Sequence, residues 1–150
     1  MTEFVSEVMR INASERTIYM VLEDLSNFGK IKNVLPVEQF KDLTFERDNI
    51  HLTIERLGKL TLRITERNYC NLIKLVVEGV PFKVDLYVQL MQTLPIDTGI
   101  KVIIRADLNP MLKGMLSKEI LRAVNKIAYA LSEIPYKDLY DENNDRGSCF

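Results

Sequence analysis

The 150-residue sequence contains no tryptophan, one histidine and two cysteines. An ordinary zinc site needs three or four histidine, cysteine or acidic ligands, and the sequence has no Cys-x-x-Cys pair to begin one. A catalytic triad needs a histidine beside a serine and an acid, and nothing near His51 sets up that arrangement. Glycine-rich phosphate-binding motifs are also absent. We therefore expect no metal and no cofactor.

Long apolar runs are missing too, and we expect no secretory leader. A membrane span needs roughly 18 consecutive apolar residues, and even the apolar stretch 72–77 is interrupted by Lys74. The first residues carry acids where a signal peptide has a basic region followed by an apolar run. Cys70 and Cys149 are too few for a disulfide framework, so we expect free thiols. These features predict a cytoplasmic protein without a membrane span.

Neither sign of charge dominates. The 20 basic and 21 acidic residues are scattered and give a net charge of -1, so no basic stripe is present to bind the phosphates of nucleic acid. A chain of this length buries enough surface for one core. We expect a single domain over residues 1–136, either monomeric or homodimeric, followed by a polar, disordered tail over residues 137–150.

Capping residues and helical spacing predict two short helices near the start of the chain. An apolar-rich stretch from Phe4 to Ile11 predicts a first strand. Ser14 is a good N-cap for a helix that starts at Glu15, where an acid favours the positive end of the helix dipole. The dipeptide Ser26-Asn27 offers a second cap, and both helices should end before Pro36.

From residue 37 to residue 108 the apolar period changes to two, which predicts six strands. The alternating sets of five of these strands are Ile50, Leu52, Ile54; Leu60, Leu62, Ile64; Ile73, Leu75, Val77; Phe82, Val84, Leu86, Val88, Leu90; and Ile100, Val102, Ile104, Ala106, Leu108. A one-residue slip would reverse the faces of a strand. The turn lengths keep every apolar set on one face.

Each of the four turns also predicts a register. The predicted turns are a three-residue turn centred on Gly58, a loop over residues 67–70, a type II′ turn at Gly79 and a longer loop through Pro95. They place Leu52 opposite Ile64, Leu62 opposite Leu75, Leu75 opposite Val84, and both Leu86 opposite Ile104 and Leu90 opposite Ile100. The predicted product is a meander with one apolar face.

A long amphipathic helix follows the strands. Asn109 is an N-cap, and Pro110 suits the first helical position because its missing N–H is not needed there. Pro135 stops the helix. Its apolar stripe comprises Leu112, Leu116, Ile120, Ala123, Val124, Ile127, Leu131 and Ile134. This stripe must pack on an apolar surface, and the sheet supplies one.

The predicted fold class is α+β, with about seven antiparallel strands curved around a long C-terminal helix and two short helices after the first strand. This order resembles the helix-grip fold of the START-like (SRPBCC) superfamily, which includes pollen-allergen relatives, polyketide cyclases and lipid-transfer domains. The resemblance is carried by segments 4–8 and 13–15, the Gly58 hairpin and segment 106–110, and looks closest to small single-domain bacterial members. It implies a cavity between sheet and helix for a lipid, sterol, isoprenoid or polyketide.

Candidate ligand contacts follow from these faces. They are Phe28, Leu52, Ile54, Arg56, Leu62, Leu75, Phe82, Val84, Leu86, Ile104, Met111, Met115 and Glu119. Arg56 would pair with a ligand carboxylate at the rim, and Glu119 would serve as a polar anchor or an acid. The aliphatic and aromatic residues among them are equally suited to an ordinary core. Glu119 is equally suited to an exposed position in which its carboxylate reaches water.

Three functions remain open. The first is binding, carrying or sensing of a small hydrophobic molecule such as a lipid, an isoprenoid, a quinone or a polyketide. The second is a cyclase- or dehydratase-like enzyme that uses acids or tyrosines in the cavity. The third is an interaction module with a filled core and an outer patch around Val76, Tyr87 and Met91.

Overall fold

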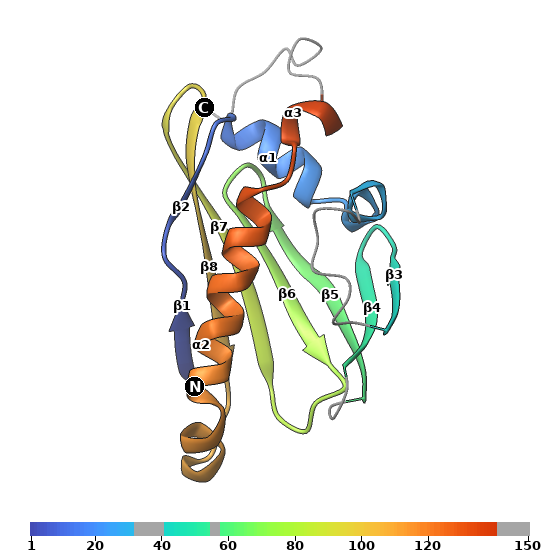
Figure 1. Cartoon of the computed structure of the whole chain (residues 1–150), viewed down its shortest axis with the longest axis vertical. Coiled ribbons are helices and arrows are strands. Elements are labelled where there is room, and N and C mark those ends of the chain that lie inside the picture. The colour runs from blue at the N-terminus through green and yellow to red at the C-terminus, as the bar shows by residue number, and fades with distance from the viewer. Residues whose placement is uncertain (32–40, 55–57, 141–150) are drawn as a thin grey trace.

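The computed structural model describes residues 1–31, 41–54 and 58–140. The elements in chain order are β1 (Thr2–Val5), β2 (Met9–Ile11), α1 (Glu15–Leu22), the 3₁₀ helix η1 (Leu25–Lys30), β3 (Lys41–Phe45), β4 (Asn49–Ile54), β5 (Gly58–Asn68), β6 (Leu72–Glu78), β7 (Val84–Leu94), β8 (Asp97–Ala106), α2 (Pro110–Ser132) and α3 (Tyr136–Leu139). Figure 1 shows a twisted sheet with α2 running along one face and α1 and α3 at one end.

The sheet has eight strands in the order β1-β8-β7-β6-β5-β4-β3, with β2 also paired to β8. All of these pairings are antiparallel. The fold class predicted from the sequence is confirmed, including the six strands that follow the short helices. The strand count exceeds the predicted seven because the first strand is in two pieces.

The first strand breaks at Ser6, whose hydroxyl oxygen accepts a hydrogen bond from the backbone of β8. Ser6 N donates to the carbonyl of Val102, and Val102 N donates to Ser6 Oγ, both at 2.8 Å. The register against β8 shifts by one residue across this break, from Val5 opposite Ile103 to Met9 opposite Ile100. A shift of one residue reverses the faces. Phe4 before the break and Ile11 after it are therefore both buried, at 7% and 6% exposed.

Helix α1 begins as predicted. Ser14 is its N-cap, and the Ser14 hydroxyl accepts a hydrogen bond from Thr17 N at 3.2 Å. The second helix differs from the prediction of a Ser26-Asn27 cap. It is a 3₁₀ helix capped two residues earlier by Asp24, because the carboxylate of Asp24 accepts hydrogen bonds from both the N–H and the hydroxyl of Ser26. The predicted end of this helix before Pro36 lies outside the described residues.

One of the four predicted registers is confirmed and three are wrong. The β7–β8 hairpin pairs Leu86 with Ile104 and Leu90 with Ile100, as expected. The other three hairpins pair Leu52 with Leu60, Leu62 with Val77, and Leu75 with Leu86. Each differs from the prediction by an even number of residues. The apolar faces are therefore conserved although the pairs are not.

These differences have local physical causes. The last pair before the β4–β5 turn is Ile54 opposite Gly58, so Gly58 belongs to a strand rather than to the turn centre. The β5–β6 turn closes with Asn68 opposite Leu72 rather than with the predicted loop over residues 67–70, and a bulge between Ile64 and Glu66 then shifts the register by one residue. Pro81 has no N–H to continue a ladder, and β7 begins only at Val84. Phe82 consequently lies in the connection before β7 instead of in the strand.

Helix α2 begins and packs as predicted. Asn109 Oδ1 accepts a hydrogen bond from Leu112 N at 2.8 Å, and Pro110 occupies the first turn. Every member of the predicted apolar stripe is buried or half-buried. The helix packs mainly against β1, β2 and β8, so α2 lies over one side of the sheet. None of the helices in the described part of the chain is long and apolar enough to cross a membrane.

The chain continues past the predicted domain boundary at residue 136 into α3. Tyr136 is 2% exposed, and its hydroxyl donates to the carbonyl of Leu131 at 2.5 Å. Leu139 and Tyr140 are half-buried against the core.

Cys70, in the turn between β5 and β6, is buried and disulfide-bonded. The prediction of a free thiol at Cys70 is therefore wrong.

Candidate functional site

The inner face of the sheet, which faces α2, carries cross-strand rows of apolar side chains that differ in burial. A row on the side toward α1 contains Val102, Val88 and Ile73, which are 0%, 7% and 2% exposed. The next row contains Phe4, Ile104, Leu86, Leu75 and Ile64. In this row Ile104 is half-buried and the other four are buried. These two rows form the floor of the core.

A third row is accessible to water. Phe45 pairs with Ile50, Ile50 with Leu62, and Leu62 with Val77, so these four side chains follow one another across four strands. All four are half-buried, as is Val84 on β7. We call these five residues the open row. An apolar row that water reaches is the feature by which this inner face differs from a solid core.

The sheet closes again beyond the open row. The next inner pair, Leu52 opposite Leu60, is buried at 8% and 7% exposed. Gly79 lies against Leu60 at φ +106°, and a Cβ at this position would collide with the carbonyl oxygen of Lys59. Glycine is therefore required here by both conformation and space. The open row thus lies between buried rows on both sides.

Helix α2 presents a half-buried flank toward the open row. Asn125 Oδ1 accepts a hydrogen bond from Glu7 N at 2.9 Å, which holds one side of α2 over the break between β1 and β2. Leu116 lies about two and a half turns earlier and so points to the opposite side. The half-buried residues on that side are Leu112, Leu116, Ala123 and Ile127. With α2 over β1 and β8, this flank heads toward β6 and β5 (Figure 1).

One end of the open row is braced by an aromatic stack and an arginine. Phe28 of η1 stacks on Phe45 with ring centroids 6.0 Å apart. Arg67 donates through Nε and Nη2 to the carbonyl of Glu23, at 3.1 and 2.8 Å, and its Nη2 lies 2.5 Å from Asp48 Oδ1. These contacts fasten the C-terminal end of α1 to β5 and to the turn between β3 and β4.

The groups with shifted pKa values belong to structural contacts. Burial raises the pKa of Tyr136, and burial followed by the charge of Glu23 raises the pKa of Tyr19. Burial also acts to raise the pKa of Asp24, but the hydrogen bonds from Ser26, together with nearby cations, outweigh it and lower that pKa. Asp24 caps η1, and the hydroxyl of Tyr136 donates a hydrogen bond to a carbonyl of α2.

His51 lies on the outer face, as its strand phase predicts. Its Nδ1 is 3.0 Å from Thr61 Oγ1, and its Nε2 is 2.6 Å from Glu46 Oε1. Among residues 1–31, 41–54 and 58–140, no group of three or more histidine, cysteine or acidic side chains is placed to hold a metal ion.

The structure brings together some of the predicted contacts. Leu62 and Val84 belong to the open row, and the half-buried Ile104 lies in the next row. Leu75 and Leu86, at 4% and 6% exposed, are floor residues of the core. Four more surround this region: Leu52 is buried in the closing pair, Ile54 and Phe82 are half-buried near it, and Phe28 backs Phe45.

Other predicted contacts lie away from the open row. Met111 and Met115 are 69% and 66% exposed, and Glu119 is exposed as well. Arg56 lies outside the described residues. The sequence prediction of the contacts had passed over Phe45, Ile50 and Val77. Ile50 and Val77 have the right alternation, but the predicted registers, which set Leu52 opposite Ile64 and Leu62 opposite Leu75, pair Leu62 with neither of them.

Comparison with known proteins identifies the fold. No family model and no curated protein matches the chain. A norcoclaurine synthase mutant from Thalictrum flavum, solved with a transition-state analogue, matches with a TM-score of 0.73 at 15% identity over 93% of this chain and 98% of that one. A START superfamily protein from Mycobacterium smegmatis matches with a TM-score of 0.61 at 17% identity over 92% and 99%.

A third match is the di-domain ARO/CYC protein BexL of the BE-7585A biosynthetic pathway. Its TM-score is 0.66 at 12% identity, over 88% of this chain and 45% of that one. Identities this low carry information about fold. The resemblance predicted from segments 4–8, 13–15 and 106–110 is confirmed at that level: the chain has the helix-grip fold of START and Bet v1-like proteins.

Proposed function

We propose that the protein binds a small hydrophobic molecule along the open row, between the inner face of the sheet and the half-buried flank of α2. The observation that carries this proposal is the open row itself. Five apolar side chains that water reaches lie between buried rows, and covering them with an apolar ligand removes them from water. Neighbours with this fold hold small molecules, including a norcoclaurine synthase in complex with dopamine and hydroxybenzaldehyde.

The size of the ligand follows from the energetics. Each buried methylene contributes about 0.8 kcal/mol, and micromolar affinity requires about 8 kcal/mol. About ten methylene equivalents are therefore needed, before the costs of ordering ligand and protein are counted. The side chains of the open row offer no charge to add to this sum. A molecule of lipid, isoprenoid, quinone or polyketide size meets the requirement, and a small polar metabolite does not.

Two matched variants test the proposal. Val77 belongs to the open row, whereas its neighbour Val76 lies on the outer face of β6, opposite Asp85 and Arg63. Both side chains are half-buried. Val77→Trp fills the open row, and Val76→Trp makes the same change on the other face. We expect Val77→Trp to weaken binding of the fluorescent fatty acid cis-parinaric acid by about tenfold or more, equivalent to 1.4 kcal/mol, and Val76→Trp to leave it nearly unchanged.

Competition identifies the ligand class. Unlabelled fatty acid, ubiquinone with a short isoprenoid tail, and an aromatic polyketide are each titrated against the bound probe, and native mass spectrometry reports the stoichiometry. Failure of the wild type to bind the probe and all three competitors would contradict the proposal. Equal loss of binding in both variants would also contradict it, because the ligand would then not lie on the inner face.

A further inference from the structure

The solvent-facing side of α2 carries a stripe whose composition differs from the rest of the chain. At about 100° per residue, its members fall within one narrow arc: Met111, Met115, Lys118, Arg122, Lys126 and Tyr129. All six are exposed, with Met111, Met115 and Tyr129 at 69%, 66% and 59%. We call these six residues the outer stripe. Large apolar side chains thus lie at both ends of it and cations in the middle.

The first turns of α2 extend beyond the sheet. Residues about 18 apart share one heading, because five turns of 3.6 residues separate them. Leu131 is 7% exposed against the core, whereas Lys113 has the same heading and is exposed. Figure 1 shows the first turns of α2 projecting past the end of β1. The side chains of Met111 and Met115 can therefore be buried in an apolar medium outside the protein without any loss of core contacts.

Charge separates α2 from the rest of the molecule. Between Pro110 and Ser132 the helix carries Lys113, Lys118, Arg122 and Lys126 against Glu119, which is a net charge of +3. The whole chain has a net charge of -1. The remaining residues are therefore net acidic, and positive charge is concentrated along α2. The expectation of evenly scattered charges is wrong for this helix. Such a helix is complementary to an anionic surface.

We propose that the outer stripe docks α2 onto the surface of an anionic phospholipid bilayer. An interfacial helix of this type inserts its apolar side chains at the level of the headgroups while its lysines and arginines lie against the lipid phosphates. Tyrosine is favoured at the same interface because one end of its ring is apolar and the other is wet. The long stems of the cations can extend along the boundary.

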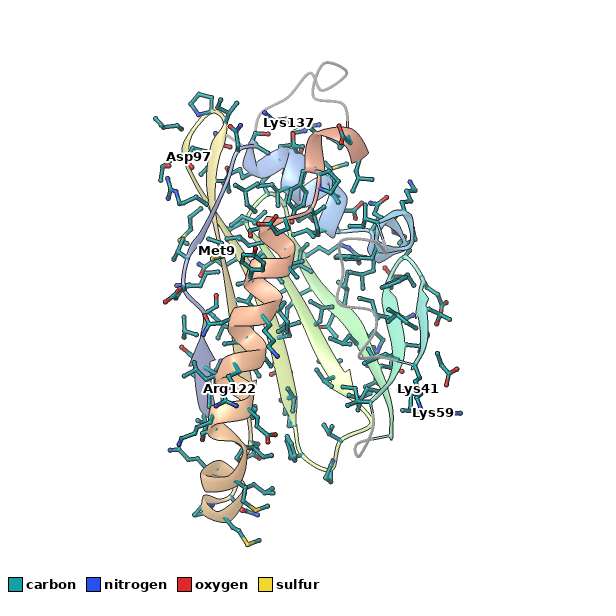
Figure 2. The ribbon with its side chains drawn as sticks, in the orientation of Figure 1. Met9, Lys41, Lys59, Asp97, Arg122 and Lys137 are labelled. Atoms are coloured by element: carbon teal, nitrogen blue, oxygen red, sulfur yellow. The ribbon has the colours of Figure 1, made fainter. Side chains whose placement is uncertain are left out.

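Other partners match the stripe less well. Nucleic acid would satisfy the cations but would leave both methionines in water, and a protein interface needs a contiguous apolar centre, whereas here the apolar groups are separated by three cations. Lys41 and Lys59 show that isolated basic residues also occur at the opposite side of the molecule (Figure 2). These two lysines lie on β3 and β5, away from the outer stripe.

This arrangement provides a matched charge control. Lys118→Glu with Arg122→Glu reverses two charges in the outer stripe, and Lys41→Glu with Lys59→Glu reverses two exposed charges far from it. Sedimentation with vesicles of phosphatidylcholine containing about one third phosphatidylglycerol measures the affinity. We expect the wild type to bind these vesicles, to bind pure phosphatidylcholine vesicles at least about tenfold more weakly, and to be released by about 1 M salt.

The double variant of the outer stripe should lose at least about tenfold in affinity, and the control pair should lose less than about threefold. Because the chain contains no tryptophan, Met115→Trp supplies a single fluorophore whose emission should shift to the blue on binding. Leu94→Trp, at a position 60% exposed at the end of β7, should show no such shift.

Three outcomes overturn the proposal: no binding to anionic vesicles, equal binding to neutral vesicles, or equal losses in the two charge-reversal pairs. Circular dichroism of each variant verifies that it is folded. The vesicles carry no added ligand, so the result does not depend on ligand binding along the open row. Retained probe binding by the stripe variant would separate a failure of docking from a failure of the proposed function.

Discussion

Tyr136 shows how one side chain connects two elements. Its ring is almost completely buried, and its hydroxyl donates to the carbonyl of Leu131 in the last turns of α2. The carbonyls at the end of a helix lack partners within the helix, so this bond satisfies a group that would otherwise be buried without one. Burial also disfavours the ionised ring and raises its pKa above the ordinary value of 10.0.

Tyr136→Phe should lower the free energy of unfolding by about 1–3 kcal/mol, because it leaves the Leu131 carbonyl buried and unsatisfied. Urea denaturation measures this change. Tyr140→Phe is the control, since Tyr140 is half-buried and at the edge of the core. Equal effects of the two changes would show that the buried hydrogen bond contributes nothing specific.

The same variant should alter the pH dependence of stability. In the unfolded chain Tyr136 loses its proton near pH 10, whereas the folded protein retains it, so the folded state binds more protons above that pH. The contribution is complete below pH 10 and is lost as pH rises further. The wild type should therefore lose stability more steeply above about pH 10 than Tyr136→Phe does. Parallel curves from denaturation at a series of pH values would contradict this expectation.

At the scale of elements, α1 and α2 begin with similar caps in different surroundings. Ser14 caps a helix whose residues Ile18 and Val21 are almost completely buried, at 0% and 1% exposed. Asn109 caps turns of α2 in which Met111 and Met115 are exposed. A cap contributes about 1 kcal/mol to its helix. Whether that energy enters the stability of the whole fold depends on whether the capped turn is coupled to the core.

Ser14→Ala should reduce the free energy of global unfolding by about 1 kcal/mol, since losing the first turn of α1 disturbs the core. Asn109→Ala should reduce it by less than about half of that amount and should instead speed hydrogen exchange in the first turn of α2. Denaturation and mass-spectrometric hydrogen exchange distinguish the two effects. A larger global loss for Asn109→Ala would indicate that the start of α2 is not independent of the core.

For the whole molecule, the decisive property is that burial is uneven across one continuous apolar face. The row of Val102, Val88 and Ile73 is closed, and the open row is accessible, although both have the same alternation. α2 covers the side of β1 and β8, and α1 with α3 covers one end. The open row remains where neither cover reaches. The outer stripe of α2 is exposed because it lies on the side of the helix opposite the buried Val124, Ala128 and Leu131.

Two leucine truncations measure this difference. Leu75 is 4% exposed in the core floor, and Leu62 is half-buried in the open row. Leu75→Ala should cost about 2–5 kcal/mol through the lost transfer energy and the cavity that it creates. Leu62→Ala should cost clearly less, because part of its side chain already meets water. Equal losses in urea denaturation would mean that the open row is as tightly packed as the core.

Part of the candidate site could be predicted from the sequence. Leu62, Val84 and Ile104 were predicted to face inward, and they do. Phe4 and Ile11 are separated by an odd number of positions, so an unbroken strand could not have buried both, and the break at Ser6 could have been foreseen. No sequence signal marked Val77 or Ile50 as partners of Leu62, because the β5–β6 register depends on a bulge and the β4–β5 register on the end of a turn.

The sequence by itself determined the element order, the faces of the strands, the starts of α1 and α2, and the apolar stripe of α2. These properties arise from capping and from periods of two and 3.6 residues, which act over a few neighbouring positions. The tertiary structure alone decided the strand registers, the path of α2 over β1 and β8, and hence which apolar row stays accessible. Registers and cover depend on contacts between residues far apart in the chain, and alternation is unchanged by any even shift.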